Sequence, residues 1–183
     1  MTTTTAASEL AIARYESPVG ELKLVASERG LRAVLWPLDA TADQVDRVRL
    51  GKQSRRSTPV LDETERQLDE YFAGTRLAFD LLLDLQGTEF QRNVWLSLAD
   101  VGFGKTRSYG EQAKRLGRPT ATRAVASANG KNPLSIVLPC HRIVGANGSL
   151  TGFAGGLENK AYLLDHERKV LGLAPKWSEN RLF

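Results

Sequence analysis

The chain has 183 residues, of which 42% are apolar, and this suffices for one sizeable core or for two small cores that share an interface. No apolar run is long enough to cross a bilayer, and residues 1–7 lack the basic and apolar parts of a secretory signal. The single cysteine, Cys140, excludes an intramolecular disulfide and a cluster of thiolate metal ligands. We therefore expect a cytoplasmic protein with a disordered N-terminal tail and without a metal or a cofactor. A zinc site of one cysteine, two histidines and a carboxylate is the alternative.

The net charge of +4 is distributed unevenly along the chain. Residues 1–87 contain 11 Lys and Arg against 14 Asp and Glu, a net charge of −3, whereas residues 88–183 contain 14 against 7, a net charge of +7. A basic half of this kind indicates a polyanionic partner. A well-solvated surface without such a partner would have the same composition, so charge alone leaves both interpretations open.

The first half has the pattern of a small α/β domain. Residues 21–26 and 31–36 are apolar runs on either side of a turn and predict two strands. Residues 37–57 lack periodicity and are rich in basic side chains, which predicts a long polar loop. Alternating apolar side chains over residues 77–85 predict a further strand. Between the loop and this strand a helix is predicted, capped by Thr58, with Pro59 at its first position and its end at Gly74.

The second half is mainly helical in its pattern, and we divide the chain into domains of residues 1–86 and 87–183. A turn of about three residues containing Gly joins two of the helices, as in helix-turn-helix proteins, although bundles that bind no DNA share this arrangement. The short apolar run 136–138 predicts a buried strand that leads to Cys140. Helices are predicted over residues 88–99, 108–116, 120–129 and 157–171, the first three capped by Thr88, Ser108 and Thr120.

Cys140 is a candidate nucleophile. A thiol reacts as its thiolate, and the adjacent His141 and Arg142 would both favour the anion. Neighbouring side chains of an extended chain point to opposite faces, so contact between Cys140 and His141 requires a bend or a bridging water. A third group must orient the imidazole, and Glu167 is one candidate. A core cysteine or a thiol on an exposed loop explains the adjacency equally well.

A larger set of motifs is more specific than this pair. It comprises Gly87-Thr88-Glu89-Phe90-Gln91, Val94-Trp95, Ser108-Tyr109-Gly110-Glu111, Asn129-Gly130-Lys131-Asn132-Pro133, Pro139-Cys140-His141-Arg142 and Thr151-Gly152-Phe153-Ala154-Gly155-Gly156. With these motifs the chain resembles the methylated-DNA–protein-cysteine methyltransferases, also called alkylguanine-DNA alkyltransferases. The resemblance is strong over about residues 87–171 and holds only in outline before them.

The resemblance implies an α/β N-terminal domain of ribonuclease-H-like outline and a mainly helical C-terminal domain with a winged helix-turn-helix. It implies irreversible transfer of the alkyl group of 6-O-alkylguanine, and of 4-O-alkylthymine, in double-stranded DNA to Cys140. A thioether has no carbonyl for water to attack, so each molecule would act once. The protein would be a monomer, with cooperative binding to DNA left open.

The resemblance also implies roles for individual residues. His141 would take the thiol proton through a water, Glu167 would hold His141, and Asn132 would brace the active-site turn. The damaged base would be flipped into a pocket, with Arg123 filling the vacated stack and Tyr109 crowding the phosphate 3′ of the lesion. Other implied DNA contacts are Ser108, Thr120 and the small Ala121, Ala124 and Ala128. The implied pocket residues are Ser135, Val137, Phe153, where the family commonly has tyrosine, and Ala154.

Three other functions fit the sequence less well than alkyl transfer to Cys140. A lesion-binding relative that transfers nothing would lack the cysteine, and a transcription regulator would leave Pro139-Cys140-His141-Arg142 unexplained. A cysteine hydrolase would turn over its ester or amide substrate repeatedly, which distinguishes it from a protein that reacts once.

Overall fold

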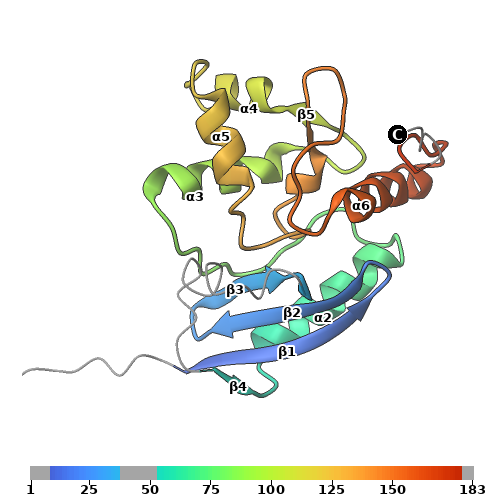
Figure 1. Cartoon of the computed structure of the whole chain (residues 1–183). Coiled ribbons are helices and arrows are strands. Elements are labelled where there is room, and N and C mark those ends of the chain that lie inside the picture. Colours follow the sequence, from blue (N-terminus) through green and yellow to red (C-terminus); the bar gives the residue numbers. More distant parts are fainter. Residues whose placement is uncertain (1–8, 38–52, 179–183) are drawn as a thin grey trace, which may run out of the picture.

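The computed structural model describes residues 9–37 and 53–178. The expected N-terminal tail and most of the expected loop at 37–57 lie outside the described residues. Figure 1 shows a sheet with one helix in the lower part of the molecule and a mainly helical part above it.

The N-terminal part is a four-stranded sheet in the order β3-β2-β1-β4, with α2 (Pro59–Phe72) packed against it (Figure 1). The strands at 21–26 and 31–36 are confirmed as an antiparallel pair. A short strand lies at the end of the stretch expected to be a loop, where it pairs in parallel with the first strand. The strands are β1 (Leu10–Ser17), β2 (Gly20–Ser27), β3 (Gly30–Leu35) and β4 (Gln53–Arg55).

Helix α2 begins as its sequence predicts. The Thr58 side chain accepts a hydrogen bond from the Leu61 N–H at 3.2 Å, and Pro59 occupies the first turn, where its missing N–H leaves no helical bond unmade. Leu61, Leu68 and Tyr71 are buried and form the face of α2 that packs on the sheet and the rest of the core. Gly74 follows the helix with a φ of 78°, the left-handed conformation that suits a helix end.

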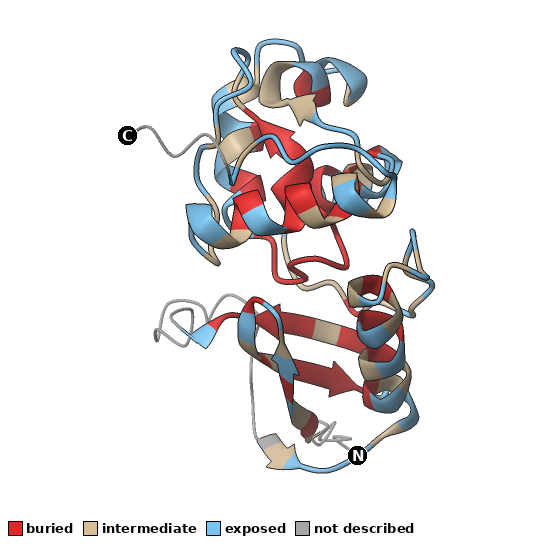
Figure 2. Cartoon of the chain, turned by 90° about the vertical axis from the view of Figure 1, so that its right-hand side faces the viewer, coloured by how far each residue is buried: buried red, intermediate tan, exposed pale blue. Residues whose placement is uncertain are grey.

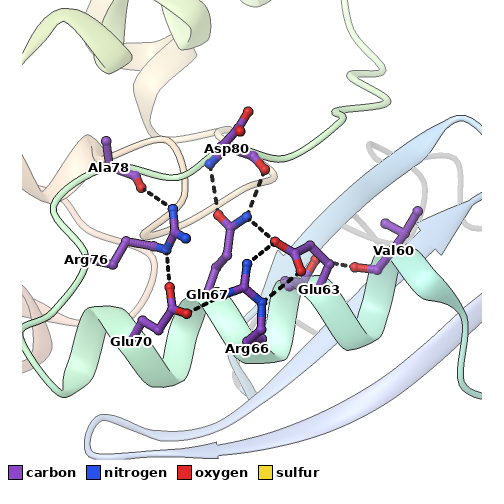
Figure 3. A network of polar contacts seen from close by, with 9 residues as sticks. Val60, Glu63, Arg66, Gln67, Glu70, Arg76, Ala78 and Asp80 are labelled. Carbon is purple, nitrogen blue, oxygen red and sulfur yellow. Dashed lines mark hydrogen bonds and ion pairs between the residues drawn. The ribbon is translucent and has the colours of Figure 1, made fainter.

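The strand predicted over residues 77–85 is wrong. This segment makes a single bridge to the sheet, Leu83 with Leu31, and is otherwise irregular. Figure 3 shows that α2 binds the first part of the segment 77–85. Gln67 of α2 donates a hydrogen bond to the Asp80 carbonyl and accepts one from the Asp80 N–H, each at 2.8 Å. A side-chain amide thus takes the bonds that a neighbouring strand would make, and alternation of side chains alone could not reveal this.

The C-terminal part consists of short helices and the longer α6 around two two-residue strands. The predicted caps Thr88 and Ser108 are both confirmed as capping boxes. Strands β5 and β6 pair in parallel and join the segment before α4 to the segment after Cys140. The elements are α3 (Glu89–Leu96), η2 (Ser97–Asp100), β5 (Arg107–Ser108), α4 (Tyr109–Arg115), α5 (Thr122–Asn129), η3 (Cys140–Arg142), β6 (Ile143–Val144) and α6 (Leu157–Val170).

Thr120 does not cap a helix, which corrects the expected start of α5. The Ala121 N–H donates to the Arg118 carbonyl at 2.9 Å, so Thr120 lies inside a backbone turn. Helix α5 begins one residue later than expected, with Ala121 in place of Thr120 at the N-cap position and no side-chain cap. The turn between α4 and α5 is therefore longer than the predicted turn of about three residues.

The buried strand predicted at 136–138 is also wrong, because these residues form a buried turn. The Leu138 N–H donates to the Leu134 carbonyl at 2.8 Å, and Ile136 has a φ of 72°. A β-branched residue rarely adopts this conformation, and it persists only where the surrounding structure holds it.

The two halves meet at the edge of β3. The Val34 N–H donates to the Pro133 carbonyl at 2.8 Å, and Val34 and Leu134 form a parallel bridge. In Figure 1 the chain descends from α5 to this edge, and in Figure 2 the segment between the two parts is buried. One apolar cluster includes residues of both halves, so the sheet of the first half supports the turn before Cys140.

Candidate active site

The turn before Cys140 is braced by one buried amide. Asn132 donates through Nδ2 to the Leu138 carbonyl at 2.8 Å and accepts the Leu134 N–H on Oδ1 at 3.0 Å. The two ends of the turn are thereby fixed to the same side chain. These are the contacts that the expected role of Asn132 requires.

Cys140, His141 and Arg142 form a single turn of 3-10 helix, η3. The chain therefore bends at Cys140, which the sequence alone required if Cys140 and His141 were to act together. Cys140 is buried, with 8% of its surface exposed, and its N–H donates to the Leu138 carbonyl at 2.8 Å. A thiol in this position is shielded from bulk water.

The structure brings His141 and Glu167 together, as predicted. His141 Nε2 lies 2.7 Å from Glu167 Oε1, and both side chains are fully buried. Glu167 comes from α6, 26 residues further along the chain. An imidazole held in this way has a fixed orientation and a fixed tautomer.

Glu167 accepts hydrogen bonds from three further groups. The Tyr71 hydroxyl donates to Oε1 at 2.9 Å, and the Gly104 N–H donates to Oε2 at 2.8 Å. Arg142 Nε lies 3.0 Å from Oε2, and its terminal nitrogen lies 3.0 Å from Oε1. Burial alone would raise the pKa of Glu167, but His141 and Arg142 stabilise the anion and lower the pKa to about 2. Glu167 is therefore a carboxylate at neutral pH.

His141 is neutral at the same pH. Burial lowers its pKa below the ordinary value of 6.5, against the opposing effect of Glu167. A carboxylate accepts but does not donate, so Nε2 carries the ring hydrogen, and Nδ1 has the lone pair. Nδ1 has no hydrogen-bond partner among the described residues, which makes it the nitrogen able to accept a proton.

The buried side chain of Lys160 interacts electrostatically with Cys140. Lys160 of α6 is fully buried, and its Nζ donates to the Thr151 carbonyl at 2.8 Å. Burial lowers the pKa of Lys160 to about 8, and Cys140 has the opposite effect. A positive charge in this environment favours the thiolate of Cys140.

The Gly-rich loop after β6 packs against the N-terminal half. The Phe153 ring contacts the Trp36 ring edge-on, with centroids 5.6 Å apart. A Cβ on Gly155 would lie 2.5 Å from an atom of Trp36, so only glycine permits this approach. Tyr109 at the start of α4 donates to the Thr151 carbonyl at 3.3 Å and so joins the start of this loop to α4.

Most of the expected DNA-contacting residues lie at the surface, and one does not. Arg123 and Ala124 of α5 and Thr120 in the turn are exposed. Ala128 is 3% exposed, and its carbonyl accepts a hydrogen bond from Trp95 Nε1 at 2.7 Å, so Ala128 belongs to the core. Small size alone could not distinguish a core alanine from a surface alanine on this helix. The Ser108 hydroxyl accepts the Glu111 N–H as the helix cap.

The expected pocket residues are only partly grouped. Phe153 and Ala154 are half-buried neighbours on the Gly-rich loop, and Ser135 is buried within the turn before Cys140. Val137 lines an apolar cavity of about 520 Å³ between the segment at 77–83 and the C-terminal part. The contact of Val137 with a substrate therefore stays a prediction.

Within residues 9–37 and 53–178, no three His, Cys, Asp or Glu side chains are grouped as metal ligands. In the same part of the chain, no helix is long and apolar enough to span a membrane.

Comparison with known proteins identifies the family. Residues 11–85 match the model of the ribonuclease-like domain of 6-O-methylguanine DNA methyltransferase, and residues 89–169 match that of its DNA binding domain. A Methanosarcina acetivorans protein named methylated-DNA–protein-cysteine methyltransferase is 43% identical over 153 residues, which cover 84% of this chain and 95% of that protein. The chain belongs to the 6-O-methylguanine DNA methyltransferase family.

Solved structures of this family have the same two-domain fold. The crystal structure of Mycobacterium tuberculosis O6-methylguanine methyltransferase is 39% identical with a TM-score of 0.75, and covers 87% of this chain and 93% of that one. The M. tuberculosis OGT structure in complex with DNA is 39% identical with a TM-score of 0.72, and covers 91% and 95%. The family fold is a ribonuclease-like N-terminal domain and a helical DNA-binding C-terminal domain.

Two residues of the candidate site, Tyr71 and Lys160, have no distinctive sequence signal. Lys160 lies in an ordinary charged helical segment, and Tyr71 fits the apolar stripe of α2, so neither stands out in its local pattern. The only available signal for Lys160 was its helical spacing to Glu167, seven residues further on, which puts both on one face of α6.

Proposed function

We propose that this chain repairs DNA by direct reversal, moving the alkyl group of 6-O-alkylguanine, and of 4-O-alkylthymine, in double-stranded DNA onto Cys140. The observation that carries the proposal is the position of Cys140 in one turn with His141, whose imidazole is held by a buried, ionised Glu167. The names of the relatives support the reaction class. The acting unit is a monomer.

In the proposed step the thiol proton of Cys140 passes, through a water, to Nδ1 of His141. The Sγ atom attacks the alkyl carbon, so that the S–C bond forms while the C–O bond breaks. The electron pair of the broken bond leaves with the base, which takes up a proton and becomes ordinary guanine. Ala154, through its backbone N–H, assists the departing oxygen, and Lys160 stabilises the thiolate. The thioether persists, so each molecule reacts once.

The proposed DNA surface is a winged helix-turn-helix. Helices α4 and α5 form the helix-turn-helix, buried Gln112 and Asn129 join them through a hydrogen bond of 2.6 Å, and the hairpin at 145–149 serves as the wing. Tyr109 and Arg123 rotate and replace the damaged base, while Ser108, Thr120 and Ala124 border the same surface. The two family models end at residue 85 and begin at residue 89, which supports a domain boundary between residues 86 and 87.

Intact-mass measurement tests the proposed function directly. After incubation with duplex DNA that contains 6-O-methylguanine, the protein should gain the mass of one methyl group, and fragment analysis should place it on Cys140. Further DNA should add nothing, because the thioether is stable. Release of many product molecules by each protein molecule would show a turning-over enzyme and contradict the proposal.

Arg123→Ala should separate base flipping from ordinary DNA binding. If the side chain fills the vacated stack, its loss should slow single-turnover transfer about fivefold on saturating duplex DNA, which is about 1 kcal/mol of uncompensated unstacking. Transfer from a free alkylated guanine base should stay near normal, since no unstacking is needed. Lys131→Ala, which removes an exposed cation next to α5, is the matched control and should weaken binding without slowing transfer at saturation. Equal slowing of Arg123→Ala on duplex and free base would contradict the flipping role.

A further inference from the structure

One side chain of the N-terminal domain, Tyr71, contacts Glu167 of the active site. Tyr71 lies near the C-terminal end of α2, is fully buried, and donates its hydroxyl hydrogen to Glu167 Oε1 at 2.9 Å. The two residues are 96 positions apart and belong to different domains. Oε1 is also the oxygen that lies 2.7 Å from His141 Nε2. The hydroxyl of one domain and the imidazole of the other therefore share a single acceptor atom.

We propose that Tyr71 is a positioning residue for alkyl transfer, whose hydroxyl fixes the Glu167 oxygen that orients His141. This inference rests on the proposed function and deepens it, because it makes the ribonuclease-like domain part of the reactive centre. Tyr71 touches neither substrate nor sulfur and acts only through Glu167.

The position of the hydroxyl is set by its own surroundings. The Tyr71 ring lies edge-on to Phe103 at 6.0 Å and tilted against Phe79 at 5.5 Å. The backbone carbonyl of Tyr71 lies 2.9 Å from His166 Nε2, which ties the end of α2 to α6 next to Glu167. Because the Tyr71 ring is packed on several sides, its hydroxyl has one fixed position. A donor must have a fixed position if it is to orient a carboxylate.

The phenol acts as a donor throughout the working pH range. Burial, followed by the neighbouring Glu167 carboxylate, raises the pKa of Tyr71 well above its ordinary value, so the hydroxyl keeps its proton. Glu167 Oε1 accepts hydrogen bonds from the Tyr71 hydroxyl, His141 and Arg142. Glu167 Oε2 accepts from the Gly104 N–H and from Arg142. Removal of the hydroxyl leaves more uncompensated negative charge on the oxygen that holds the imidazole.

This charge determines the sign of the pH effect. The charged groups that act on His141 are Glu167 and Lys160 of α6 and the adjacent Arg142, and Tyr71 acts on the first of them. A less compensated carboxylate attracts an imidazolium more strongly, so His141 should keep its proton to a higher pH. The imidazolium cannot accept the thiol proton. Without the hydroxyl, the acid limb of the rate profile should therefore move to higher pH.

The experiment compares Tyr71→Phe with Tyr15→Phe in the full chain. Tyr15 is a matched control, because it is a buried tyrosine of the same domain whose hydroxyl donates to a carboxylate, Asp69, at 2.8 Å, and because Asp69 is not in the site. Single-turnover transfer from a free alkylated guanine base is measured by intact mass from pH 5.5 to 9, so that DNA binding does not enter. Thermal unfolding by circular dichroism reports the folding of each variant.

We expect Tyr71→Phe to react about tenfold more slowly at pH 7, as for loss of a hydrogen bond to a charged group. The midpoint of its acid limb should rise by about half a unit to one unit. Tyr15→Phe should keep the wild-type rate and midpoint at a similar loss of thermal stability. In a Glu167→Gln background, Tyr71→Phe should change the rate less than twofold, because the carboxylate through which it acts is absent.

An unchanged rate and midpoint in Tyr71→Phe would overturn the inference. So would an equal slowing of both tyrosine variants with the midpoint fixed, because it would show a purely structural role. A full tenfold effect in the Glu167→Gln background would equally exclude action through Glu167. A wild-type protein that gains no alkyl mass would overturn the proposed function itself, which is a different result from a reactive wild type with an unaffected variant.

Discussion

Cys140→Ala is expected to abolish alkyl transfer and to leave DNA binding unchanged. The chain contains no other cysteine, and attack on an alkyl carbon requires a soft nucleophile that remains attached to the alkyl group. Cys140 is buried, whereas the proposed DNA contact Arg123 is exposed, so an alanine at position 140 removes no proposed DNA contact. Intact mass with methylated duplex and fluorescence anisotropy with the same labelled duplex measure the two properties separately.

Cys140→Ser provides the matched control for this variant. A hydroxyl is smaller and has a much higher pKa than a thiol, so the serine variant should also transfer nothing detectable while keeping a hydrogen-bonding group in place. Any methyl mass gained by Cys140→Ala would place the acceptor elsewhere in the chain. Loss of DNA binding in a folded Cys140→Ala protein would instead show that the reactive turn belongs to the DNA surface.

Glu167→Gln is expected to slow transfer by about 100-fold or more, the usual effect of disabling a general base. The neutral amide no longer stabilises an imidazolium on His141, and its NH₂ group can take the place of an acceptor oxygen. The variant should also unfold more readily, because Arg142 is 6% exposed and loses its carboxylate partner. Breaking one side of a buried ion pair typically costs about 3–5 kcal/mol. Urea denaturation and single-turnover transfer measure the two effects.

The lowered pKa of Glu167 also predicts how the stability of the folded protein depends on pH. The pKa of Glu167 falls from 4.5 to about 2 in the folded protein, so its stabilising contribution is complete above pH 4.5 and is lost as the pH falls from there towards 2. A difference of this size corresponds to roughly 3 kcal/mol. His141 acts in the same direction below its ordinary pKa of 6.5, because burial opposes its protonation. Between pH 4.5 and 2, Glu167→Gln should lose less stability than the wild type by the contribution of Glu167, while Asp84 and Asp165, whose pKa values are also lowered, act in both proteins.

Asp165→Asn is the matched control for the effects of Glu167→Gln. Asp165 is a buried carboxylate on the same helix, and it accepts backbone N–H groups of residues 176–178 rather than bonds from the reactive turn. Its amide variant should lose stability but transfer the alkyl group at the normal rate. Equal slowing of the two variants would mean that Glu167 acts through the general stability of α6.

Local sequence determined the features that act over three or four residues. Thr58, Thr88 and Ser108 each cap a helix through a side-chain bond to a backbone N–H three positions ahead, so their identity and spacing suffice to predict them. The motif around Cys140 determined the family in the same way. The residues alone made Glu167 one candidate partner for His141, and the resemblance to the family singled it out.

Tertiary structure decided the features whose partners are distant in the chain. Residues 136–138 look like a strand, but Asn132 and the edge of β3 hold this segment as a turn. Residues 77–85 alternate like a strand, but Gln67 of α2 takes the backbone bonds of Asp80, and the backbone of the segment meets the sheet only around Leu31. In the sequence, Tyr71 is one more apolar position of α2. Its hydroxyl meets Glu167 because α2 and α6 lie side by side in the folded protein. Periodicity records which side of an element is buried, whereas the group that it meets there depends on how the elements pack.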